Sequence, residues 1–131
     1  ETILGRRRPF HFDGNGLGRL LGKDPPETDL DVARRGGMEA QQLRAAANAP
    51  IQGSSADIIK VAMVQLQAAL ISQGLPARLL LQVHDELVLE VKPDVLEKTR
   101  DTVVRTMENA VKLTVPLVAE TGVGANWMEA K

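Results

Sequence analysis

Residues 77–92 constrain the fold more than any other part of this sequence. Two apolar runs, 79–83 and 87–91, flank the polar tripeptide His84-Asp85-Glu86. Each run has the length of a β-strand and is rich in Leu and Val, which is typical of strands. The sequence therefore predicts a β-hairpin with the tripeptide at its tip. Most hairpin turns use Asn-Gly or Asp-Gly to supply a positive φ, so a tip without glycine indicates that another requirement selects these residues.

Helices are predicted on either side of the hairpin. Residues 38–48 consist mainly of strong helix formers, and Pro50 should end that helix because the residue before a proline is disfavoured in the α region. A second helix should follow Gly53 and end near Gly74, with one apolar stripe facing the core. The stripe consists of Ile58, Ile59, Ala62, Met63, Leu66, Ala69 and Leu70.

The rest of the chain completes an α+β pattern. A third helix is predicted after Pro93, and residues 116–123 are predicted to form a further strand. Helix, helix, hairpin, helix and strand in this order favour an antiparallel sheet built on the hairpin, with helices packed on one face.

Composition excludes several classes of function. The 131 residues carry a formal net charge of −1, so no global positive field attracts nucleic acid. Without cysteine there is no disulfide framework and no Cys-ligated zinc. Only three aromatic side chains are present, too few for a platform that stacks single-stranded bases. No apolar run approaches 18 residues, so no membrane span is predicted. The chain begins with Glu1 rather than Met, and we expect it to be a piece of a longer protein.

The hairpin tip contains the candidate metal ligands, Asp85 and Glu86. Carboxylates are hard oxygen ligands that suit Mg²⁺, but a two-metal site would need at least one more carboxylate from elsewhere. The alternative is an exposed carboxylate pair that only improves solubility. His84 would either contact a phosphate or sugar or simply occupy the turn. A nuclease that also used Glu90 fits poorly, because Glu90 lies about 13 Å further along the strand at ~3.3 Å per residue.

Two groups of polar side chains precede the hairpin. Arg44 and Asn48 are four residues apart and share a helix face, with Gln52 just beyond the predicted break. They are candidates for ligand contacts, or else a surface charge and a helix cap. The cluster Arg6-Arg7-Arg8 is either a solvated charge run or a phosphate contact.

Several blocks of the sequence resemble one known family. Asn48-Ala-Pro-Ile-Gln-Gly-Ser-Ser-Ala-Asp-Ile-Ile-Lys60 and Leu81-Gln-Val-His-Asp-Glu-Leu-Val-Leu-Glu90 are similar to the C-terminal part of the palm subdomain of family A DNA polymerases, the bacterial DNA polymerase I type. The two ends of the chain are similar to that family as well. The resemblance covers residues 1–131 except the Gly- and Pro-rich stretch 13–35, which we interpret as a flexible insertion.

The resemblance implies roles for individual residues. The hairpin tip resembles the family's motif C, which makes Asp85 a catalytic magnesium ligand, Glu86 an accessory carboxylate and His84 a contact to the primer end. The matching positions Arg44, Asn48 and Gln52 contact the primer–template duplex from the minor groove. There A N3 and T O2 acceptors lie in nearly the same places for every correct pair, so side-chain donors can bind any sequence and still detect a mismatch.

The implied reaction is DNA-directed DNA synthesis. The parent enzyme would extend a primer 3′-hydroxyl with deoxynucleoside triphosphates by two-metal nucleotidyl transfer, with Mg²⁺ as cofactor and primer–template DNA as partner. The family's second metal-binding Asp and its fingers helix have no counterpart in this sequence. The chain should therefore need the fingers, the thumb and the first half of the palm, and be inactive alone.

Two further expectations accompany this interpretation. We expect a location in the bacterial cytoplasm, at the nucleoid, or in an organelle. The alternative function is a polymerase-derived module without catalysis that binds duplex DNA or a protein partner.

Overall fold

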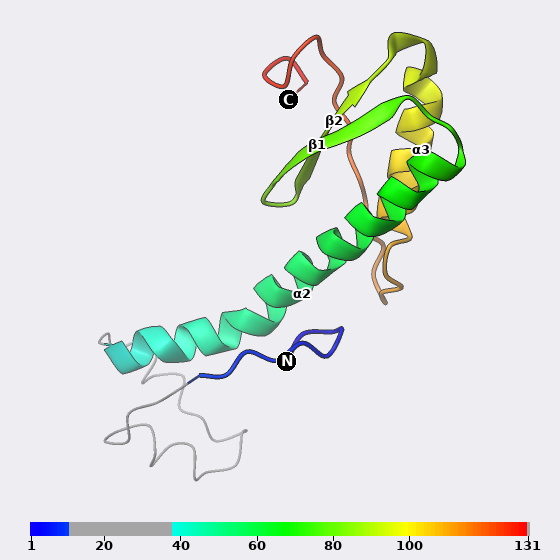
Figure 1. The fold of residues 1–131 in the computed structure, drawn as a ribbon. Coiled ribbons are helices and arrows are strands. Elements are labelled where there is room, and N and C mark those ends of the chain that lie inside the picture. Colours follow the sequence, from blue (N-terminus) through cyan, green and yellow to red (C-terminus); the bar gives the residue numbers. More distant parts are fainter. Residues whose placement is uncertain (11–37, 131) are drawn as a thin grey trace. The chain divides into compact units, whose positions relative to one another are not determined.

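The computed structural model describes residues 1–10 and 38–130, so the predicted insertion at 13–35 lies outside the described residues. Two compact units make up the chain, Glu1–Ser54 and Ser55–Lys131. The elements, labelled in Figure 1, are α2 (Met38–Ser72), β1 (Ala77–Val83), β2 (Glu86–Val91), the 3₁₀ turn η3 (Pro93–Val95) and α3 (Leu96–Glu108). An antiparallel two-stranded sheet combined with helices confirms the predicted α+β class.

Helix α2 is continuous over 35 residues, so the predicted break at Pro50 is wrong. A proline inside a helix removes one backbone hydrogen bond and destabilises the helix by about 3 kcal/mol. In α2, side chains donate hydrogen bonds to two backbone carbonyl groups, those of Pro50 and Gly53. The Ser54 hydroxyl donates to the carbonyl of Pro50, and the Arg6 guanidinium donates to the carbonyl of Gly53 at 3.1 Å. Ser54 therefore lies within the helix and does not begin a new one.

The N-terminal segment lies against α2 within the first unit. The backbone N–H of Ile3 donates to the Ser54 hydroxyl at 3.0 Å. Gly53 permits this close approach, because a Cβ at that position would lie 2.7 Å from the Thr2 methyl carbon. Thr2 is buried, and its backbone N–H donates to the carbonyl of Arg6 at 2.9 Å. Hydrogen bonds from the N-terminal segment thus reach α2 just after Pro50.

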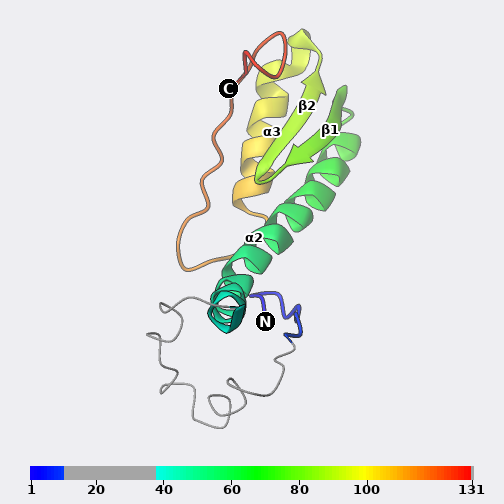
Figure 2. The same cartoon turned by 90° about the vertical axis from the view of Figure 1, so that its left-hand side faces the viewer.

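The core of the second unit lies between the hairpin and the helices (Figure 2). Leu66 at its centre is fully buried, with 0% of its surface exposed. The predicted apolar stripe is confirmed, since all its members are buried or half-buried. Leu87 and Leu89 of β2 pack against this cluster. The buried residues of the cluster are Leu66, Leu70, Leu75 and Val103, and the partly buried residues around it are Ala77, Leu87, Leu89, Val95 and Met107.

A β-bulge alters the register of the hairpin. Between Leu79 and Leu81, β1 carries one more residue than the facing part of β2. Such an insertion changes which side chains of the strand share a face beyond it. As a result Gln82 lies opposite Leu87, at a register position on the core-facing side of the sheet.

Helix α2 ends in a glycine with left-handed backbone geometry. Gly74 has a φ of 60°. Its N–H donates to the carbonyl of Ile71, and the N–H of Leu75 donates to the carbonyl of Leu70, both at 3.0 Å. These two bonds are those of a Schellman motif, and the accompanying contact between the two leucines joins the helix end to the core.

Gly74→Ala is expected to lower the free energy of unfolding by about 1–2 kcal/mol, because an L-residue is strained in the left-handed region. No atom lies within 4 Å of the added Cβ, so steric contact does not contribute. Urea unfolding followed by circular dichroism measures the change. Gly74→Asn is the matched control, since Asn tolerates this geometry better. Equal stability of the Ala variant and the wild type would contradict the assigned helix end.

The strand predicted at 116–123 is not formed. Among the described residues the sheet contains only β1 and β2, and residues 116–124 have no regular secondary structure. A strand requires a neighbouring strand to pair with, and apolar composition alone does not provide one. Val118 in this segment is 75% exposed. The segment has the composition of a strand but has no pairing partner among the described residues.

By length and composition alone, Gln41–Ser72 of α2 would suffice to cross a bilayer. This is weak evidence, because the core helix of a globular domain meets the same criterion. Arg44, Asp57 and Lys60 interrupt the segment, and its buried stripe belongs to the core of the second unit.

Candidate active site

The predicted hairpin is confirmed, but its turn contains two residues and not the three that were predicted, because Glu86 is the first residue of β2. Val83 and Glu86 form the last pair of the ladder, which leaves His84 and Asp85 between the strands. His84 has a φ of 53° and is the one non-glycine residue with positive φ in the described ranges 1–10 and 38–130. Histidine enters this region several times more often than most residues, although glycine is favoured there. The tip therefore adopts hairpin geometry without the usual glycine.

A side chain from β1 contacts the turn backbone. The Gln82 amide nitrogen, Nε2, donates to the carbonyl oxygen of His84 at 2.8 Å. The sequence alone did not identify Gln82 as a site residue. The one signal for it was that Gln82 is the polar residue in the otherwise apolar run 79–83.

The two tip carboxylates are available to a ligand. Asp85 and Glu86 are exposed, and no described residue forms a hydrogen bond or ion pair with either carboxylate. Oxygen donors of this kind fit a hard divalent cation such as Mg²⁺. No group of three His, Cys, Asp or Glu side chains that could hold a metal exists among the residues described. Within the part of the chain that the structure describes, these two carboxylates therefore have no third candidate ligand beside them.

The three candidate groove residues lie on α2, in the first unit. Arg44, Asn48 and Gln52 are all exposed. Since α2 continues through Pro50, Gln52 is not beyond a helix end, and the regular four-residue spacing places all three on one helix face. Arg44, Asn48 and Gln52 belong to the first unit. His84, Asp85 and Glu86 belong to the second unit.

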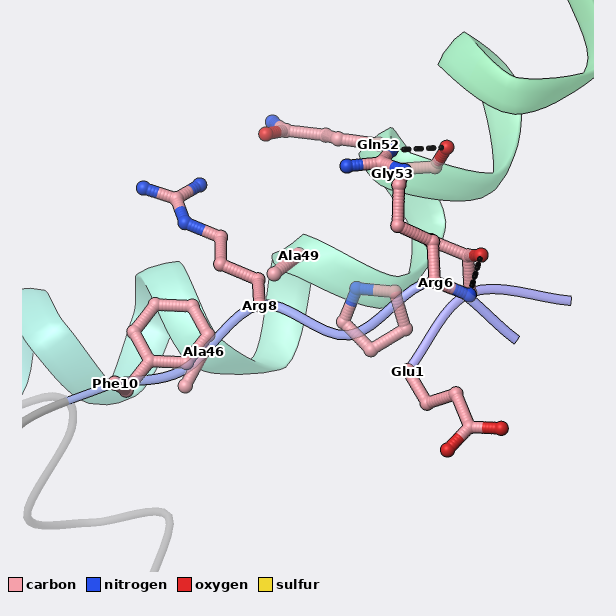
Figure 3. A pocket seen from close by; sticks show the side chains of 10 residues that line it. Glu1, Arg6, Arg8, Phe10, Ala46, Ala49, Gln52 and Gly53 are labelled. Carbon is pink, nitrogen blue, oxygen red and sulfur yellow. Dashed lines mark hydrogen bonds between the residues drawn. The ribbon is translucent and has the colours of Figure 1, made fainter. Parts of the chain in front are cut away.

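A pocket of about 370 Å³ in the first unit is lined in part by Gln52, Arg6, Arg8 and Phe10. Figure 3 shows Arg8 and Gln52 on the same side of the N-terminal segment. The Arg8 guanidinium lies 5.2 Å from the centre of the Phe10 ring, within the range of a cation–π contact. The pocket wall thus combines positive charge with an amide donor.

The three consecutive arginines have different contacts. Arg6 donates to the carbonyl of Gly53, and Arg7 forms a 3.1 Å ion pair with Glu1. Arg8 contacts an aromatic ring at the pocket. The sequence alternatives of a solvated run and a phosphate contact both missed the structural contact of Arg6 with α2, because residues 47 positions apart in the chain form it.

Known proteins with similar sequences are DNA polymerases. The chain is 52% identical over 130 residues to DNA polymerase I of Synechocystis sp., covering 99% of this chain and 13% of that relative. It is 49% identical over 131 residues to thermostable DNA polymerase I of Thermus filiformis, covering 100% of this chain and 13% of that relative. The chain therefore spans about one eighth of the length of these relatives.

A solved structure has a similar fold. It is the POL domain of Pol1 from M. smegmatis in complex with DNA primer-template and dNTP. Its sequence is 39% identical and its TM-score is 0.73, with 98% of this chain and 20% of that chain covered. In addition, the sequence model of DNA polymerase family A matches residues 1–129. With nearly the whole sequence matched, this chain belongs to DNA polymerase family A.

Proposed function

We propose that this chain is the part of a DNA-directed DNA polymerase that presents Asp85 and Glu86 to the primer end and the incoming deoxynucleoside triphosphate. The observation that carries the proposal is the hairpin tip. Two adjacent exposed carboxylates lie at a glycine-free turn, Asp85 within it and Glu86 directly after it, and the strands of the same hairpin pack against the core. A charged tip on strands that pack against a core is suited to hold ligands at a fixed position.

Asp85 and Glu86 would hold Mg²⁺. A metal bound there would supply Lewis-acid stabilisation of the negative charge that develops during nucleotidyl transfer. The contribution of this chain is to keep two negative oxygens exposed at the tip, without competing partners among the described residues. Because these residues supply only part of a coordination shell, we propose that the remaining ligands come from the rest of the parent polymerase, from substrate phosphates and from water.

The donors on α2 would bind the primer–template duplex. Arg44, Asn48 and Gln52 present hydrogen-bond donors on one exposed helix face, as readout of minor-groove acceptors requires. Arg8 adds positive charge to the pocket beside Gln52, which favours a polyanion. His84 would contact the primer end. Primer-template DNA and dNTP are bound by the M. smegmatis neighbour, and this supports both ligand classes here.

Gln52→Ala in the complete polymerase is expected to reduce discrimination against a mismatched primer end about five- to tenfold, since one hydrogen bond to a base edge is removed. Incorporation on a matched primer should change much less. Single-turnover extension of matched and mismatched primers measures both. Gln67→Ala, another exposed position on α2, is the control. An unchanged mismatch response would remove Gln52 from the groove contact.

The proposal is tested by magnesium-dependent primer extension. The 131-residue chain is assayed alone and after mixing with the remaining part of its parent polymerase, with circular dichroism to show that both pieces are folded. We expect no synthesis by the chain alone and synthesis on mixing. Extension by the chain alone would contradict the incomplete site. DNA binding by folded pieces without synthesis on mixing would favour a module that binds duplex DNA without catalysis.

A further inference from the structure

We propose that Gln82 is a positioning residue that holds Asp85 in its metal-binding orientation through the backbone of His84. The inference rests on the proposed function and deepens it. Gln82 Nε2 donates to the His84 carbonyl at 2.8 Å. That carbonyl and the N–H of Asp85 belong to one planar peptide unit. Restraining the carbonyl therefore restrains the backbone on the N-terminal side of Asp85, and with it the direction of the Asp85 side chain.

The turn requires such a restraint. His84 has a φ of 53°, a geometry that is unfavourable for a residue other than glycine. The turn contains no glycine to relieve this strain. The exposed carboxylates of Asp85 and Glu86 have no described partner that orients them. Among the described residues, Gln82 supplies the side-chain hydrogen bond to the turn that the structure records.

At the register position of Gln82, a polar residue is unexpected from the packing of the sheet. The bulge after Leu79 puts Gln82 opposite Leu87, which packs against the core. An apolar side chain would be the usual choice at such a register position. Gln82 is instead exposed, at the end of the strand, and its amide reaches the turn. The residue type is thus explained by the turn and not by the core.

Preorganisation of this kind has a measurable signature. If only a fraction of tips has Asp85 correctly oriented, the apparent dissociation constant for a metal rises by the inverse of that fraction. One exposed hydrogen bond contributes about 1 kcal/mol, which corresponds to a factor of about five at 25 °C. A high metal concentration selects the productive tip and compensates for the loss. A general folding defect would not respond in this way.

The test compares Gln82→Met, which keeps side-chain length but lacks the donor, with Gln67→Met at an exposed position of α2. Both are made in the complete polymerase with primer–template bound. Electron paramagnetic resonance titration gives the dissociation constant of Mn²⁺, used as a probe for Mg²⁺. We expect this constant to rise about fivefold in Gln82→Met and to stay unchanged in Gln67→Met. The half-saturating Mg²⁺ concentration for extension should rise equally, with kcat at saturating Mg²⁺ close to that of the wild type.

Other outcomes overturn the inference. Unchanged Mn²⁺ affinity in both Gln82→Met and Gln82→Thr, a second variant that favours the strand and lacks the amide, would show that the tip needs no such restraint. A lower melting temperature with activity that Mg²⁺ does not restore would indicate a merely structural role. Asp85→Asn separates the two proposals. If it keeps Mn²⁺ affinity and activity, the proposed function fails; if it loses both while Gln82→Met behaves as wild type, only the role of Gln82 fails.

Discussion

Asp85→Asn is expected to lower nucleotide incorporation by the complete polymerase about 10²- to 10³-fold, the range seen when one preorganised electrostatic contact to a transition state is removed. The change replaces a negative oxygen donor with a neutral amide at the tip. Asp85 is exposed and lies outside the core cluster, so stability should change by less than about 0.5 kcal/mol. Single-turnover incorporation and urea unfolding measure the two effects.

Asp101→Asn is the matched control, because Asp101 is an exposed aspartate on α3 in the same unit. It should leave incorporation within about twofold of the wild type, as expected for a surface substitution. Near-normal turnover in the Asp85 variant would remove Asp85 from the metal site. An equal loss in both variants would point to net charge and not to a specific ligand.

Leu66→Ala should give the largest loss of stability, about 3 kcal/mol or more. Leu66 is fully buried at the centre of the second unit, and truncation removes apolar contacts and leaves a cavity. Equilibrium urea unfolding followed by circular dichroism measures the loss. The midpoint should fall, with little change in the dependence on urea concentration.

Ile71→Ala serves as its control, since it removes the same number of carbon atoms from a helix residue that is 70% exposed. Its effect should stay below about 0.5 kcal/mol. If the two variants were equally stable, Leu66 would not be at the centre of the core. Because Leu66 is not one of the proposed metal ligands and stability is the quantity measured, this experiment tests the fold without relying on the proposed metal site.

Local patterns predicted much of the second unit. The two strands, the glycine-free tip and the apolar stripe of α2 each follow from the spacing of apolar residues within about ten positions. Gly74 as a helix end follows from glycine's access to positive φ. These features are confirmed because their causes are local in sequence.

The features that the sequence did not predict depend on distant contacts. Helix formation through Pro50 is accompanied by hydrogen bonds from the N-terminal segment to Ser54 and Gly53, far away in the chain. Residues 116–123 have the composition of a strand, but pairing depends on a neighbour that composition does not specify.

In the candidate site as well, local sequence predicted some features, and others depend on contacts that the sequence does not specify. Asp85 and Glu86 were expected at an exposed tip from the residues themselves, whereas their roles came from the family resemblance. The contact of Gln82 with the turn depends on a one-residue bulge, which no apolar pattern specifies. Arg8 and Gln52 line the same pocket because the N-terminal segment packs on α2.

Because α2 is continuous, the spacing of the three proposed groove contacts along the helix axis can be stated. In an unbroken helix, a four-residue step advances about 6 Å along the axis. Arg44 and Gln52 are therefore about 12 Å apart along that axis, the length of three to four base-pair steps at about 3.4 Å each. A polymerase with such a helix face along its duplex would inspect several recently formed pairs at once. A wrong pair would then still be detected after further nucleotides had been added beyond it.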